Sequence, residues 1–123
     1  MPLDATALPD EFGLQVTTRP GAAVVAVRGE VDMAVAPELQ AAIQGLADCP
    51  LVVLECSQVS FCDSSGLRTI VGEERRLRGA GTHLVIAAPS DRLRDVLQAT
   101  QLHRVLSVAD TLDAALAAQR PAA

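Results

Sequence analysis

The sequence predicts a small single-domain α/β protein in which helices pack on a mixed β-sheet. Its length of 123 residues suits one domain. Half of the residues are hydrophobic and only 2% are aromatic, so the core has to be aliphatic. Apolar runs alternate with helical spacings in the order β-β-α-β-α-β-α-β-α. Strand–helix–strand units of this length favour parallel neighbouring strands, and an initial hairpin makes the sheet mixed.

The first half of the chain predicts two strands, a helix and a buried strand. Residues 14–16 alternate apolar and polar side chains, as on a half-buried edge strand. A turn at 19–21 leads into the apolar run 22–27, the second strand of the hairpin. Pro37 suits the first turn of a helix, whose apolar residues recur at Leu39, Ile43 and Leu46. The continuous aliphatic run 51–54 predicts a strand covered on both faces.

A long central helix is predicted over about 65–78, ending at the glycines of 79–81. Its expected apolar face consists of Leu67, Ile70, Val71 and Leu77. The charged residues of its second half predict a solvated face, formed by Glu73, Glu74, Arg75, Arg76 and Arg78.

The last third of the chain predicts two more strands and two more helices. Residues 84–88 are a candidate buried strand, and residues 105–108 are a candidate last strand. Ser90 can cap the helix between them, with Leu93, Val96 and Leu97 facing inward. Asp110 or Thr111 opens a final helix.

Both ends of the chain differ in composition from the segment between them. We expect residues 12–118 to form the domain, with 1–11 and 119–123 as flexible ends. The first ten residues hold two acids and no cation, which is unlike a signal peptide. The longest apolar run, 22–27, is far too short to span a membrane. The sequence therefore predicts a cytoplasmic protein without a membrane partner.

The charged residues exclude several chemistries. Fifteen acids outnumber ten cations, which gives a net charge of -5, and all ten cations are arginines. Without lysine, there is no P-loop lysine, Schiff-base lysine or lysine general base. The negative charge also disfavours direct nucleic-acid binding, which requires cations that neutralise phosphates.

The cysteines and histidines predict neither a metal site nor a cofactor. Cys49, Cys56 and Cys62 form no C-x-x-C pair, and His83 and His103 stand alone in the sequence. We expect reduced thiols, with Cys56 and Cys62 acting as small apolar residues in or near the core.

The most unusual stretch, residues 60–67, joins the buried strand to the central helix. Loops at the carboxyl ends of parallel strands are where α/β folds usually place their sites. Ser64 and Ser65 lie beside Asp63 at a helix start, where backbone N–H groups favour a negative group. Gly66 has no side chain, so a partner could approach closely.

Two other interpretations of this stretch stay open at the level of local pattern. Asp63 and the serines are good N-cap residues for any helix. A serine hydrolase would need G-x-S-x-G, but Cys62 stands where the first glycine belongs. His83 and His103 are expected on the surface rather than in a catalytic triad.

A second candidate is the segment 29–32, at the end of the second expected strand. Its acids, Glu30 and Asp32, could bind the cations of a partner. They could equally belong to a solvated loop with a helix cap nearby.

Together, these segments resemble the STAS domain of bacterial anti-sigma factor antagonists. The resemblance rests on Gly-Glu-Val-Asp at 29–32, the aliphatic run 51–54, and Phe-Cys-Asp-Ser-Ser-Gly-Leu at 61–67. It extends from about Phe12 to Ala118 and implies a STAS-like fold.

This resemblance implies a binding protein rather than an enzyme, with no catalytic residue of its own. Its partner would be an anti-sigma factor with serine kinase activity, and binding that partner would release a sigma factor. The kinase would phosphorylate Ser65, with Ser64 as the second choice because spacing alone does not separate them. A phosphatase would reset the switch. The partner-binding residues would be Asp32, Asp63, Ser64 and Gly66.

One position departs from the family's pattern. The family commonly has Thr three residues after the strand-end Asp, where this chain has Val35, so a hydroxyl near Asp32 is missing. Two alternatives remain: a STAS subunit of a larger assembly, such as a stress-signalling complex or a lipid-transport ATPase, and a weak nucleotide hydrolase. The sequence predicts neither the sigma factor nor the oligomeric state.

Overall fold

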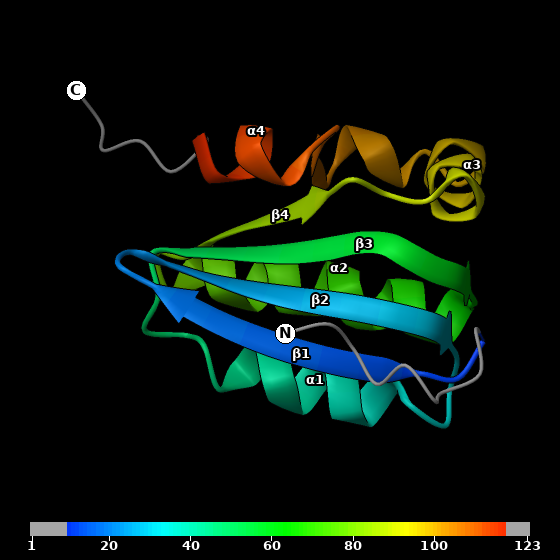
Figure 1. Ribbon diagram of the computed structural model, residues 1–123, viewed down its shortest axis with the longest axis horizontal. Helices are drawn as coiled ribbons and strands as arrows, with labels where there is room; N and C mark the ends of the chain where they lie inside the picture. The colour runs from blue at the N-terminus through cyan, green and yellow to red at the C-terminus, as the bar shows by residue number, and fades with distance from the viewer. Residues whose placement is uncertain (1–9, 118–123) are drawn as a thin grey trace.

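The structure is a computed structural model that describes residues 10–117. Over these residues, five strands form one sheet in the order β1-β2-β3-β4-β5, with helices on both faces (Figure 1). The strands are β1 (Gly13–Arg19), β2 (Ala22–Val31), β3 (Leu51–Cys62), β4 (His83–Ala87) and β5 (Ser107–Ala109). The helices are α1 (Ala36–Gln44), α2 (Ser64–Gly79), α3 (Asp91–Ala99), the short 3-10 helix η1 (Leu102–Arg104) and α4 (Leu112–Ala117). The expected flexible ends, 1–11 and 119–123, fall mainly on residues outside the described range.

The predicted fold class is confirmed, including the mixed sheet. Strand β1 pairs antiparallel with β2, and the pairs β2–β3, β3–β4 and β4–β5 are parallel. The turn between β1 and β2 contains Gly21 at a φ of 78°, which glycine adopts without steric cost. Parallel strands place their carboxyl ends at one edge of the sheet, and this edge positions the candidate site.

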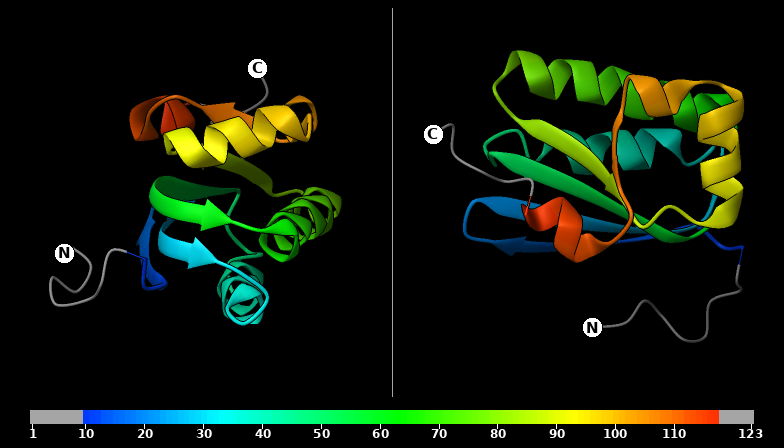
Figure 2. Two further views of the ribbon diagram at one scale, coloured as in Figure 1. Left: turned by 90° about the vertical axis from the view of Figure 1, so that its right-hand side faces the viewer. Right: turned by 90° about the horizontal axis from the view of Figure 1, so that it is seen from above.

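Two apolar clusters hold the helices on the sheet. Helices α1 and α2 lie side by side on one face, and α4 covers the other (Figures 1 and 2). The cluster beneath α1 and α2 includes Val25, Ile43, Val52, Leu54 and Leu77. The smaller cluster beneath α4 includes Leu51, Val53, Val85 and Ala115. Successive residues of 51–54 thus point to opposite faces and are all buried, as the unbroken aliphatic run predicts.

Strand β3 is much longer than the predicted run 51–54. It continues to Cys62 because Cys56, Val59 and Cys62 still face the core, while polar residues occupy positions between them. Its partner β2 extends to Val31 rather than Val27, and the pairing survives two register shifts. Long-range pairing therefore sustains a strand whose local pattern is interrupted.

The end of the chain also differs from expectation in detail. The last strand is β5 at 107–109 rather than 105–108, because Val105 is 61% exposed and the Leu106 N–H bonds back to the Leu102 carbonyl. The 3-10 helix η1 was not predicted. Ser90 caps α3 as expected, accepting from the Leu93 N–H at 3.2 Å. Of the two candidates for the α4 start, Thr111 is the cap, and it accepts from Ala114 N–H at 3.0 Å.

Two of the three thiols, Cys56 and Cys62, are buried and stay protonated near neutral pH. Cys56 and Cys62 are 2% and 3% exposed, which confirms their expected place in the core. Burial, with a smaller effect from Asp63, raises the pKa of Cys62 from 9.0 to about 12. Burial, followed by the nearby Cys62 and Glu55, raises the pKa of Cys56 as well. Since these thiols ionise first in the unfolded state, stability is expected to fall as the pH rises above about 9.

Of the three thiols, only Cys49 is expected to react rapidly with a disulfide reagent at pH 8. Cys49 is partly exposed, whereas Cys56 and Cys62 are buried and protonated, and the thiolate is the reactive form. The measurement is the number of thiols titrated before and after unfolding in guanidinium. A Cys49→Ser variant should lose the fast phase. Rapid reaction of either remaining thiol in the folded Cys49→Ser variant would contradict the burial of Cys56 and Cys62.

Candidate functional site

The two candidate motifs meet because β2 and β3 are parallel neighbours that end together. Val31 pairs with Cys62, so Asp32 and Asp63 leave the sheet at the same edge. The Asp63 N–H donates to the Val31 carbonyl at 3.0 Å, which ties the start of α2 to the end of β2. Segments far apart in the sequence therefore form one site.

Both aspartates hold backbone N–H groups of their own loops. Asp63 is the N-cap of α2, and its Oδ1 accepts from the Gly66 N–H at 3.0 Å. Asp32 Oδ1 accepts from the Ala34 and Val35 N–H groups at 3.0 and 3.2 Å. The capping interpretation is thus correct for Asp63, whereas the Asp32 carboxylate holds the loop that precedes α1.

Asp32 also explains how α1 starts without a hydroxyl at Val35. Val35 is the N-cap of α1 and has no side-chain capping bond. The Asp32 carbonyl accepts from the Ala36 N–H at 2.9 Å, while its carboxylate takes the two preceding N–H groups. Val35 packs instead against the larger apolar cluster. The departure from the family's pattern therefore leaves the helix start satisfied.

The two serines have different surroundings. Ser64 is the first residue of α2, one earlier than predicted, and is exposed. Ser65 is partly buried and lines a groove between α1 and α2. Gly66 is buried, and a Cβ there would lie 2.7 Å from Cys62 Sγ and 2.8 Å from Val31 Cγ1. The close approach that Gly66 permits is thus that of α2 to the strand ends.

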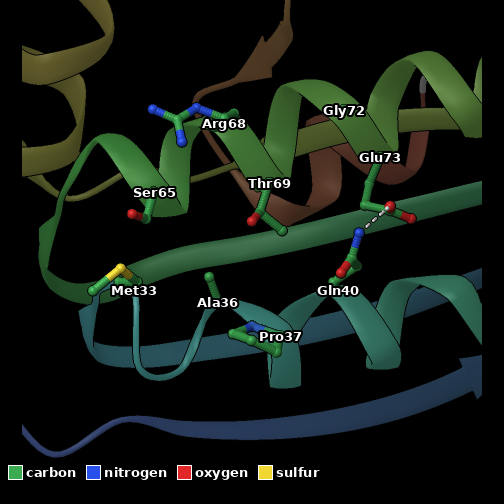
Figure 3. A pocket seen from close by; sticks show the side chains of 9 residues that line it. All are labelled: Met33, Ala36, Pro37, Gln40, Ser65, Arg68, Thr69, Gly72 and Glu73. Carbon is green, nitrogen blue, oxygen red and sulfur yellow. Dashed lines mark hydrogen bonds between the residues drawn. The ribbon is translucent and has the colours of Figure 1, made fainter.

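The groove beside Ser65 encloses about 350 Å³. Ser65 and Thr69 face α1 across it, and Met33 lies at its mouth (Figure 3). Met33 is 75% exposed, which is unusual for a large apolar side chain. The lining residues are Met33, Ala36, Pro37, Gln40, Ser65, Arg68, Thr69, Gly72 and Glu73. The groove thus combines an apolar mouth with two hydroxyls.

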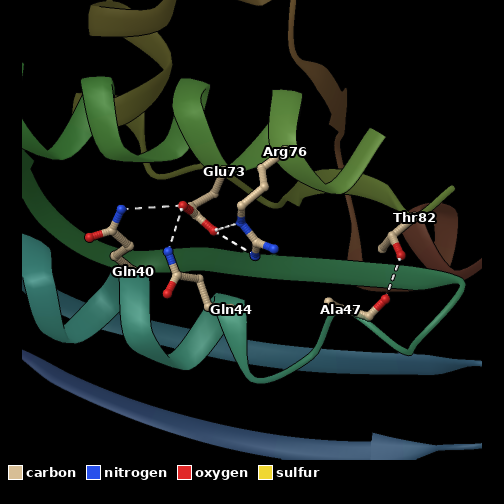
Figure 4. A network of polar contacts seen from close by, with 6 residues as sticks. All are labelled: Gln40, Gln44, Ala47, Glu73, Arg76 and Thr82. Atoms are coloured by element: carbon tan, nitrogen blue, oxygen red, sulfur yellow. Dashed lines mark hydrogen bonds and ion pairs between the residues drawn. The ribbon is translucent and has the colours of Figure 1, made fainter. Parts of the chain in front are cut away.

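Glu73 is not on a solvated face, so the expectation is wrong for this residue, whereas Arg75, Arg76 and Arg78 are exposed as expected. Glu73 is 3% exposed and lies between α1 and α2 (Figure 4). Its Oε1 accepts from Arg76 Nε at 2.9 Å, and its Oε2 accepts from the Gln40 and Gln44 amides, each at 3.3 Å. One signal in the sequence could have found it: Glu73 falls three residues after Ile70 and four before Leu77, on the apolar stripe of α2.

Replacing Glu73 with Ala is expected to destabilise the protein by about 1–3 kcal/mol, because a buried side chain is removed and three side chains lose the acceptor that joins the two helices. Glu74→Ala is the matched control. Within residues 10–117, Glu74 pairs only with exposed Arg78, at 3.6 Å, so its loss should cost about 0–1 kcal/mol. Chemical denaturation of the three proteins measures both effects. Equal stabilities of the two variants would contradict a structural role for Glu73.

Neither His83 nor His103 contacts Ser64 or Ser65. His83 begins β4, at the opposite edge of the sheet from Asp63, and its Nε2 contacts Ser107 Oγ at 3.0 Å. His103 Nδ1 contacts the Leu97 carbonyl at 3.2 Å. Within residues 10–117, no group of three or more His, Cys, Asp or Glu side chains could hold a metal ion. In the same range, no helix is both long enough and apolar enough to cross a membrane.

The fold and the site define a single α/β domain with two hydroxyls at a capped helix start, beside a second strand-end loop. The sequence matches the STAS domain family over residues 13–115, and the chain belongs to that family. The resemblance noted from the motifs at 29–32 and 61–67 is thereby confirmed.

Two of the similar proteins are named as anti-sigma factor antagonists, and a third has a phosphorylated form. The chain is 32% identical to the anti-sigma-B factor antagonist of Listeria monocytogenes over 67% of this chain and 74% of that protein. It superposes on an anti-sigma factor antagonist from Mycobacterium paratuberculosis with a TM-score of 0.83 at 32% identity, over 94% of this chain and 99% of that one. The Bacillus cell fate determinant SpoIIAA in its phosphorylated form gives a TM-score of 0.66 at 26% identity, over 89% of this chain and 100% of that one.

Proposed function

We propose that this protein is an anti-sigma factor antagonist that binds an anti-sigma factor with serine kinase activity and so releases the sigma factor. The observation that carries the proposal is the placement of Ser65. Ser65 is the second residue of α2, whose N-cap is Asp63. It lies next to the Asp32 loop and lines a groove. The similarity to SpoIIAA, which has a phosphorylated form, supports regulation by phosphorylation.

In this proposal, phosphorylation of Ser65 switches the protein off. The γ-phosphoryl group of ATP passes to Ser65 Oγ, the hydroxyl proton goes to the kinase, and ADP leaves. Phosphate adds roughly -1.5 to -2 charges at neutral pH. The net charge would then move from -5 to about -7. The N-terminus of α2 can accommodate the new charge without unfolding, so the main effect falls on the partner surface.

The proposed partner surface surrounds Ser65 and consists of Asp32, Asp63, Ser64 and Gly66, and we add Met33 because it is exposed at the groove. The aspartates hold the two loops in shape, and Gly66 seats α2 against them. Exposed Ser64 and Met33 offer a hydroxyl and an apolar contact. The protein supplies the phosphate acceptor, whereas the kinase positions nucleotide and metal, so no enzyme activity is proposed for this chain. A phosphatase would restore the binding form, and we place the cycle in the cytoplasm.

The test is phosphorylation of the wild type, Ser64→Ala and Ser65→Ala by candidate serine kinases with Mg-ATP, read by phosphate-affinity gels and mass spectrometry. We expect one phosphate, lost only in Ser65→Ala. Loss only in Ser64→Ala would keep the mechanism and move the site. No phosphate from a kinase that binds the protein would favour a constitutive subunit of a larger assembly.

A further inference from the structure

The groove beside Ser65 contains a cation without an acid partner among the described residues. Arg68 lines the groove and is exposed. Over residues 10–117, its guanidinium makes no ion pair and no hydrogen bond to another side chain. Among residues 10–117, Arg75 and Arg92 are also exposed without an ion pair, but of these three arginines only Arg68 lines the groove beside Ser65.

The acids of the candidate site and of the groove already have partners. Asp63 and Asp32 accept from backbone N–H groups of their loops. Glu73, in the same groove, is held by Arg76 and two glutamine amides. On the α1 side, the lining residues are uncharged: Ala36, Pro37 and Gln40. Arg68 therefore remains available as a cation at this site.

Arg68 follows Ser65 by three residues on α2. Residues three apart on an α-helix are neighbours on its surface, with Cβ atoms about 5–6 Å apart. Helical side chains lean toward the N-terminus, which brings the Arg68 side chain back over the preceding turn. Figure 3 shows its guanidinium extending toward the end of α2 that carries Ser65.

We infer that Arg68 is the internal partner of a phosphate on Ser65. The guanidinium would donate two parallel N–H bonds to phosphate oxygens, a geometry that arginine provides and lysine does not. The inference rests on Ser65 being the modified residue of the proposed function. It adds that phosphorylation does more than introduce negative charge: it also withdraws the free cation of the groove from any acidic group of the partner.

The test uses protein with phosphoserine incorporated at position 65 during translation, so that no kinase is required. The proteins compared are the otherwise wild-type chain, Arg68→Gln, Arg68→Lys and Arg75→Gln. Arg75 is the matched control, because it is exposed on the same helix but lies about 10 Å farther along it. A phosphorus NMR titration measures the pKa of the phosphate, and proton–nitrogen spectra follow the arginine Nε–H groups.

We expect the phosphate pKa to be lowest with Arg68, because the cation favours the dianion. It should rise in Arg68→Gln, rise less in Arg68→Lys, and stay unchanged in Arg75→Gln. The Arg68 Nε–H resonance should move on phosphorylation, and 1 M salt should reduce the effect. An equal phosphate pKa in the otherwise wild-type chain and in Arg68→Gln, together with an unmoved Arg68 resonance, would overturn the inference. The kinase assay decides the proposed function separately.

Discussion

Phosphoserine at position 65 is expected to weaken binding of the partner anti-sigma factor by about 150-fold, which corresponds to about 3 kcal/mol. The phosphate would lie at the groove mouth beside Met33, where it adds bulk, repels acids of the partner and has to be desolvated. The measurement is calorimetric titration of the partner identified by the kinase assay into unmodified and modified protein.

Phosphoserine at Ser107 provides the control for this experiment. Ser107 is exposed on the edge strand β5, two strands away from β3, and the modification changes the net charge by the same amount. Binding should then stay within about twofold, since surface charges farther apart than about 8 Å are largely screened at physiological salt. A similar loss at both positions would show that net charge, rather than the place of the phosphate, controls binding.

Replacing Gly66 with Ala is expected to destabilise the protein by about 1–3 kcal/mol. The new methyl group would meet Cys62 Sγ at 2.7 Å, Val31 Cγ1 at 2.8 Å and the Val31 carbonyl at 3.0 Å. To admit it, the start of α2 has to move away from the strand ends, which also displaces Ser65. We therefore expect both a lower denaturation midpoint and weaker partner binding.

Replacing Gly72 with Ala should instead raise the stability of the protein. Gly72 lies in the middle of α2, and a Cβ there meets nothing within 4 Å. Alanine should therefore stabilise the helix by about 0.5–1 kcal/mol, because it restricts the unfolded chain without any overlap. Urea denaturation of both variants against wild type separates the two effects. If Gly66→Ala were as stable as Gly72→Ala, the close packing of α2 against Val31 and Cys62 at Gly66 would be refuted.

Features set by neighbours in the chain were predictable from the sequence. Asp63 caps α2 and Ser90 caps α3 because an N-cap bond spans only three residues. The aliphatic run at 51–54 is buried on both faces because no polar side chain interrupts it. These elements, in their order, were enough to predict the fold class.

Features set by distant contacts were not predictable in this way. The pattern after Leu54 is interrupted by polar residues, yet β3 continues to Cys62 because β2 pairs with it. Glu73 sits in a charged run, and its burial depends on two glutamines of α1 that only packing brings near. Tertiary partners overrode the local pattern in both cases.

The sequence by itself determined the strands, the α-helices, their order and the caps of α2 and α3, because propensity and hydrogen-bond chemistry act over a few residues. Its motifs at 29–32 and 61–67 also indicated the family. The tertiary structure alone decided that Asp32 and Asp63 share one edge of the sheet, since this depends on the parallel register that pairs Val31 with Cys62. It also decided that Ser65 faces a groove while Ser64 faces solvent, because packing of α2 against α1 sets which side of the helix is covered.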